Sequence, residues 1–106
     1  MANFNKLVRD RIPEIIKESG RECIITVLED HDYLKSLNNK LKEELDEYYT
    51  DDDITELADL VEVIYAILKY KGISIEEFEK IRLDKKTKRG GFDKGVFLVS
   101  TFVDKK

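Results

Sequence analysis

The stretch LKEELDEYYTDDDITELADLVEVIYAI, residues 41–67, contains two apolar patterns at helical spacing joined by a polar segment. It also holds ten carboxylates and one basic side chain, Lys42. Two helices that packed their apolar residues together would bring these like charges into one region. The stretch therefore predicts either a solvated acidic face or a site for a positive charge that the sequence does not supply.

The patterns on both sides of the polar segment predict two long antiparallel helices. The first is expected over roughly 32–49 and the second from about 54 to 71, with Gly72 closing it and a turn over 50–54 between them. The apolar stripe of the first helix is Leu34, Leu37, Leu41, Leu45 and Tyr48. That of the second is Leu57, Leu60, Val61, Ile64 and Leu68, widened by Val63 and Ile67.

Shorter elements are expected around this helical hairpin. A helix is predicted to begin around Asp10 to Ile12 and to stop at Gly20, and a capping box of Ser74 and Glu77 predicts a fourth helix. Residues 22–28 and 96–103 are rich in β-branched and apolar residues and predict short β segments. The fold class is therefore mainly α, with a four-helix-bundle-type core expected on dimerisation.

Length and composition limit the architecture and the partners. A chain of 106 residues predicts one small domain, residues 1–106, with a thin core. No apolar run is long enough to span a membrane, and a single cysteine, Cys23, fits a reducing cytoplasm. The net charge is −4, but residues 42–62 carry a local −9 and residues 80–95 a local +5. Because this basic block is matched by an acidic one, nucleic-acid binding is not expected.

Helical geometry places some of the acids beside the apolar stripes. Glu44 and Glu47 step off the edge of the first stripe, whereas Glu43 points outward. In the second helix Glu56 falls inside the apolar arc, and Asp59 lies at its margin. An acid inside an apolar arc is unfavourable unless it is paired, protonated or bound to a metal.

Two acidic pairs on facing helices can converge across one seam. Lys40 and Lys42 are only marginally placed to neutralise them. Hard divalent cations select clustered carboxylate oxygens, so Mg²⁺ is the expected ion, with Mn²⁺ as an alternative. A competing interpretation is a calcium loop of the EF-hand type that starts at Asp51, although Glu56 stands where such a loop needs glycine.

Four short motifs then carry a resemblance to a known family. EELDE (43–47) and ELAD (56–59) resemble the EExxE and ExxD motifs of the MazG-like, all-α nucleoside triphosphate pyrophosphohydrolases. KLVRDRIPEII (6–16) and KRGGFDKG (88–95) resemble the opening and closing stretches of a small house-cleaning subgroup, often described as phosphoribosyl-ATP pyrophosphohydrolase-like. The motifs occur in the expected order over nearly the whole chain, although the gap between Glu47 and Glu56 is shorter than in many relatives.

The resemblance implies a chemistry and assigns residues to it. Such enzymes hydrolyse a nucleoside triphosphate between its α and β phosphorus atoms and release the monophosphate and pyrophosphate. The metal ligands implied by the motifs are Glu44, Glu47, Glu56 and Asp59. Glu43 matches the first acid of EExxE and, from its outward angle, is expected to orient water. The expected phosphate contacts are Lys85, Arg89, Lys94, Arg9 and Lys6.

Two further interpretations remain open at this point. The same chemistry would serve phosphoribosyl-ATP hydrolysis in histidine synthesis. Alternatively, the chain is a helical module that binds nucleotides without turning them over. The full set of four acids favours an enzyme, and a homodimer is expected from the family and from the thin core.

Overall fold

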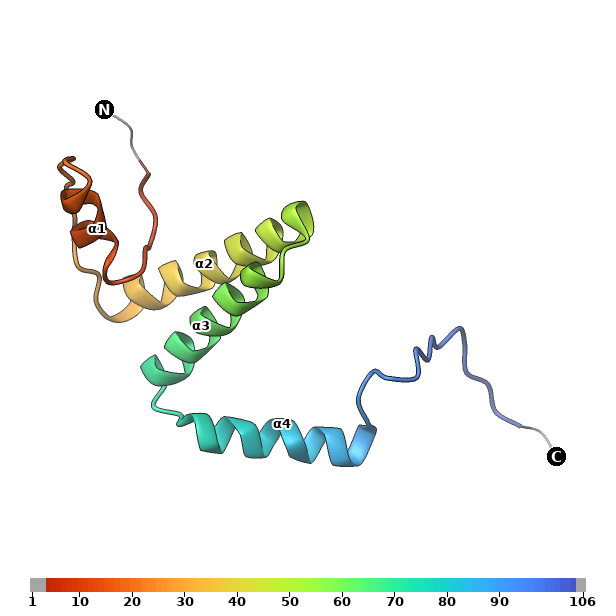
Figure 1. The fold of residues 1–106 in the computed structure, drawn as a ribbon. Helices are drawn as coiled ribbons and strands as arrows, with labels where there is room; N and C mark the ends of the chain where they lie inside the picture. The colour runs from red at the N-terminus through yellow and green to blue at the C-terminus, as the bar shows by residue number, and fades with distance from the viewer. Residues whose placement is uncertain (1–3, 105–106) are drawn as a thin grey trace. The chain divides into compact units, whose positions relative to one another are not determined.

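The computed structural model describes residues 4–104, and in this range the chain forms four helices and no strand. The helices are α1 (Ile12–Glu18), α2 (Asp30–Asp51), α3 (Ile54–Tyr70) and α4 (Ile75–Arg89), drawn in Figure 1. The predicted mainly-α class is therefore confirmed. The chain divides into two compact units, Met1–Ile75 and Glu76–Lys106. None of the described helices has both the length and the apolar character needed to cross a membrane.

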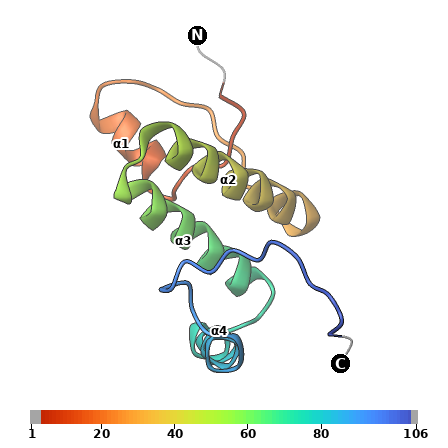
Figure 2. The same cartoon turned by 90° about the vertical axis from the view of Figure 1, so that its right-hand side faces the viewer.

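The first unit is built around the hairpin of α2 and α3, which pack against each other (Figures 1 and 2). The ring of Tyr33, near the start of α2, lies edge-on to the ring of Tyr70, the last residue of α3, with ring centres 5.8 Å apart. This contact joins the open end of the hairpin, so the two helices run antiparallel as predicted. The buried apolar side chains of the described residues are Leu37, Val63 and Leu68.

A very short connection turns the chain between the two helices. Asp52 takes left-handed backbone angles, φ 51° and ψ 36°, and its N–H donates to the carbonyl of Tyr48 over 2.8 Å. Aspartate tolerates this conformation better than most residues that have a side chain. Asp53 then caps α3, since its carboxylate accepts from the N–H of Thr55 over 3.0 Å. Consecutive aspartates thus make the tight turn that the short spacing between the two acidic motifs requires.

Glycines end α1 and α3 where the sequence predicts them. Gly20 and Gly72 have φ of +86° and +74°, values that residues with a Cβ atom rarely adopt. After α1, the N–H of Arg21 donates to the carbonyl of Ile16. After α3, the N–H of Ile73 donates to the carbonyl of Leu68. Both ends form the motif in which a left-handed glycine lets the chain bond back to the last turn.

Some sequence expectations are not met in the described residues. Residues 22–28 and 96–103 belong to no helix or strand there, and Ile24 and Phe97 are 92% and 87% exposed. A β-strand needs a hydrogen-bonded neighbour, and neither segment finds one in the described chain. Val61, expected in the apolar stripe of α3, is 41% exposed. The packed face of α3 is therefore turned toward Val63 and Leu68.

Candidate metal site

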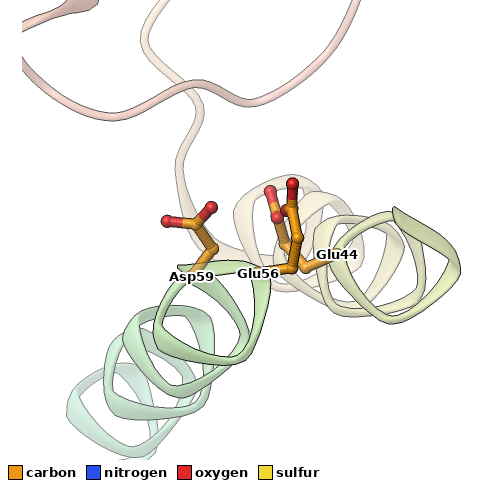
Figure 3. A group of neighbouring side chains, drawn as sticks. All are labelled: Glu44, Glu56 and Asp59. Atoms are coloured by element: carbon orange, nitrogen blue, oxygen red, sulfur yellow. The ribbon is translucent and has the colours of Figure 1, made fainter. Parts of the chain in front are cut away.

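Three carboxylates from the two long helices come together at the hairpin. Glu44 extends from α2, and Glu56 and Asp59 extend from the first turns of α3. One oxygen of each lies within 4.8 Å of the others. Figure 3 shows the three side chains on the same side of the hairpin, with Glu44 and Glu56 next to each other. The convergence predicted from the helical spacing is confirmed for these three acids.

Glu44 is the most unusual of the three because it is buried. Only 6% of its surface is exposed, and it is the one buried charged residue in the described part of the chain. Its Oε2 atom and the Oε2 atom of Glu56 are enclosed and find no hydrogen-bond partner among the described residues. A buried carboxylate oxygen without a partner is costly, so each needs a proton or a cation.

Glu47 adds a fourth carboxylate at the edge of this group. It is half-buried on α2, one turn after Glu44, and its charge acts on both Glu44 and Glu56. Burial raises the pKa of Glu44, Lys40 opposes this, and Glu47 raises it further. The pKa of Glu56 is raised to about 7, first by burial and then by Glu47 and Asp51. The acids therefore resist being ionised together unless a cation joins them.

The position of Glu56 was predictable, whereas that of Asp51 was missed. Glu56 is two helical turns before the buried Val63, so the sequence correctly placed it inside the packed face. Asp51 is the last residue of α2 and lies close enough to affect Glu56 across the turn. The sequence analysis placed Asp51 in a turn over 50–54, whereas α2 continues through Asp51 and only two residues separate it from α3.

Basic side chains surround the carboxylates from two directions. Within α2, the Nζ atom of Lys40 lies 3.3 Å from Oε1 of both Glu43 and Glu44. From the segment before α1, Lys6 Nζ lies 3.3 Å from Oε1 of Glu43. The expectation that Lys40 is only marginally placed was wrong. Its long side chain reaches the acids three and four residues later, which are neighbours on a helix surface.

Glu43 is held by these two lysines. Burial acts to raise the pKa of Glu43, but the charges of Lys40 and Lys6 outweigh it and bring this pKa below its ordinary value. The side chain is 29% exposed, so Glu43 lies at the edge of the site. It is therefore ionised and paired, and it is not one of the three converging acids.

Arg9 completes the basic side of the site. Its Nη2 atom donates to Oδ1 of Asp59 over 2.7 Å. Six carboxylates (Glu43, Glu44, Glu47, Asp51, Glu56 and Asp59) thus lie near three cations (Lys6, Arg9 and Lys40), a formal charge of −3. A divalent cation fits this donor set, because all the free donors are carboxylate oxygens and two of them are buried without partners.

The remaining predicted phosphate contacts lie on the second unit. Lys85 and Arg89 are four residues apart on α4, which extends to Arg89, so they share a helix face. Lys94 follows in the glycine-containing loop after α4. Lys6 and Arg9, by contrast, are already at the carboxylates. The role of the three residues of the second unit stays a prediction.

The calcium-loop interpretation is contradicted by the helix boundaries. Such a loop starting at Asp51 would need residues 52–62 to bend around an ion. Instead α3 begins at Ile54 and is regular through Glu62, and only Asp52 and Asp53 are outside the helices. The acids of this stretch therefore act from helices.

The chain is similar to a curated protein over part of its length. No protein-family model and no solved structure matches the chain. An uncharacterized protein of Mycolicibacterium smegmatis (strain ATCC 700084 / mc(2)155) is 52% identical over 42 residues. The match covers 40% of this chain and 43% of the relative, so less than half of the relative's length is spanned.

Proposed function

We propose that the chain is a Mg²⁺-dependent nucleotide pyrophosphohydrolase, with Mn²⁺ as an alternative ion. The observation that carries the proposal is the pair of buried, unpartnered oxygens, Glu44 Oε2 and Glu56 Oε2, beside Asp59. A buried carboxylate oxygen without a partner is costly, and a bound cation would supply the missing partner. The resemblance of residues 43–47 and 56–59 to the EExxE and ExxD motifs supports the same conclusion.

In this proposal the acids divide into ligands and supporting groups. Glu44, Glu56 and Asp59 would hold the ion, and Glu47, which acts on both Glu44 and Glu56, would complete the set. A bound Mg²⁺ would offset phosphate charge and lower the pKa of a coordinated water. Glu43, fixed by Lys6 and Lys40, would orient water at the edge of the site.

Basic side chains would recognise the phosphates. Lys6 and Arg9 lie at the rim, 44% and 57% exposed, and can therefore turn toward a ligand at small cost. Further phosphate contacts are proposed for three basic residues of the second unit, Lys85, Arg89 and Lys94. The substrate class is a nucleoside triphosphate, normal or noncanonical, cleaved to the monophosphate and pyrophosphate. A homodimer in the cytoplasm is proposed as the working form.

The metal site is tested first by binding alone. Titration of the chain with Mn²⁺, followed by electron paramagnetic resonance, is expected to show saturable binding that Glu44→Gln and Glu56→Gln each weaken by about tenfold or more. Asp84→Asn, on α4, is a matched control because it removes one carboxylate that pairs locally with Lys88. Binding that is equal in all four proteins would exclude the proposed site.

Two alternatives are separated by substrate. Growth of a histidine auxotroph that lacks phosphoribosyl-ATP hydrolysis would be restored only if that nucleotide is the substrate. A module that binds without turnover would bind Mn²⁺ and nucleotides yet release no pyrophosphate from any member of a nucleotide panel. The pyrophosphohydrolase proposal requires release from at least one of them.

A further inference from the structure

Lys40 occupies a position that distinguishes it from the other lysines of α2. Its side chain is only 16% exposed, and its ammonium lies 3.3 Å from Oε1 of Glu43 and 3.3 Å from Oε1 of Glu44. Lys42, two residues later, is 78% exposed and pairs with Asp46 over 2.9 Å on the outer surface. Both are helix pairs at short spacing, but only Lys40 is directed into the candidate metal site.

The contact with Lys40 distinguishes the two oxygens of Glu44. Oε1 is engaged by the ammonium, whereas Oε2 is enclosed and has no partner among the described residues. The terminal torsion of a glutamate is broad and roughly two-fold, so a carboxylate held at neither oxygen can rotate. An ammonium fixed at Oε1 removes that freedom and leaves the enclosed Oε2 as the free oxygen of Glu44, a residue that offers one oxygen within 4.8 Å of Glu56 and Asp59.

We propose that Lys40 is a positioning residue for the metal site, which fixes Oε1 of Glu44 and thereby presents Oε2 to the divalent cation. The inference rests on the proposed metal site and assigns Lys40 a role that the acidic motifs do not include. Groups that hold metal ligands in place contribute strongly to affinity in many metal sites. Lys40 has the two features such a group needs, burial and a direct contact with a ligand.

A role in charge balance alone predicts the opposite effect on metal binding. If Lys40 only offset the acids, its removal would make the site more negative, and a divalent cation would bind more tightly. If Lys40 positions Glu44, its removal frees the carboxylate and the cation binds more weakly, in spite of the added negative charge. The sign of the change therefore separates the two roles.

The experiment compares Mn²⁺ affinity, by electron paramagnetic resonance or calorimetry, for the full chain and its variants at mildly alkaline pH, where the carboxylates are ionised. Lys40→Met is expected to weaken binding by about tenfold, the lower end of the effect for groups that support metal ligands. Lys40→Arg, which keeps a donor able to bridge two carboxylates, is expected to recover most of the loss. Lys42→Met, the matched control, is expected to bind like the parent within about twofold.

Each result decides the inference. Equal or tighter binding by Lys40→Met, or no recovery by Lys40→Arg, would overturn the positioning role while the metal site itself stands. If the parent binds no Mn²⁺, the proposed site and the inference both fail. Amide NMR spectra of the metal-free variants check that they fold. If Lys40→Met does not fold, Lys40→Ala, which is a good helix former and has no donor, takes its place with the same expected weakening.

Discussion

Arg9 donates from Nη2 to Oδ1 of Asp59 over 2.7 Å, and so connects the segment before α1 to a candidate metal ligand 50 residues later in the chain. The two side chains are 57% and 38% exposed. An exposed ion pair of this kind contributes little to stability. The pair joins the KLVRDRIPEII stretch to the candidate site, and under the proposed function Arg9 would pass from this carboxylate to a phosphate.

Replacing Arg9 is therefore expected to affect substrate use more than folding. Arg9→Ala should lower the free energy of unfolding by less than about 1 kcal/mol, measured by denaturant titration. It should also raise the KM for a triphosphate substrate, because one phosphate contact is lost. Arg11→Ala, which removes an arginine paired locally with Glu14, is the control and should leave KM unchanged. Equal KM values for the two variants would contradict a phosphate role for Arg9.

The packing of the hairpin predicts unequal effects of two apolar substitutions. Leu37 is 3% exposed between α2 and α3, so Leu37→Ala should lower the free energy of unfolding by about 3 kcal/mol. Val61 is 41% exposed, so Val61→Ala should change it by less than about 0.5 kcal/mol. Denaturant unfolding of the metal-free protein measures both. A larger loss at Val61 would mean that α3 packs through a different face.

The raised pKa of Glu56 predicts how metal-free stability depends on pH. The ordinary value is 4.5, and burial with Glu47 and Asp51 raises the folded value to about 7. The folded state therefore holds the proton more tightly than the unfolded state. The contribution of the Glu56 proton to stability is complete below a pH of about 4.5 and is lost as the pH rises through about 7. Unfolding midpoints measured in a chelator should fall across this interval, and in Glu56→Gln they should fall less.

The same substitution should uncouple stability from metal binding. The side-chain amide introduced by Glu56→Gln is neutral and can donate to the carboxylates of Glu47 or Asp51, which the ionised Glu56 cannot do. Above pH 7 the metal-free variant is expected to unfold at a higher midpoint than the parent, and added Mg²⁺ should raise the parent's midpoint more than the variant's. Thermal unfolding with and without Mg²⁺ measures this. Equal responses of the two proteins to Mg²⁺ would argue against Glu56 as a ligand.

The sequence predicted the hairpin well because periodicity and end signals agreed there. The apolar spacing, the polar turn over 50–54 and Gly72 as a stop all point to the same two helices, and α3 begins and ends within one residue of expectation. Glu56 was placed correctly for the same reason, since its angle on the helix follows from its distance to Val63.

Other features could not be predicted because they depend on flexible side chains or distant partners. Lys40 was underestimated since the angle of a Cα atom does not show where a long lysine side chain ends. The pairing of Arg9 with Asp59 joins residues 50 positions apart, and nothing in local periodicity specifies it. The segments 22–28 and 96–103 have strand-like composition, but a strand also requires a neighbour, which composition cannot provide.

The central claim is tested most directly by the identity of the products. The chain is incubated with a panel of normal and noncanonical nucleoside triphosphates and Mg²⁺, and the products are read by phosphorus NMR. The account predicts that at least one nucleotide gives its monophosphate and pyrophosphate, and that a chelator or Glu56→Gln abolishes the reaction. Release of the diphosphate and inorganic phosphate, or the same low rate for the parent and Glu56→Gln with every nucleotide, would contradict it.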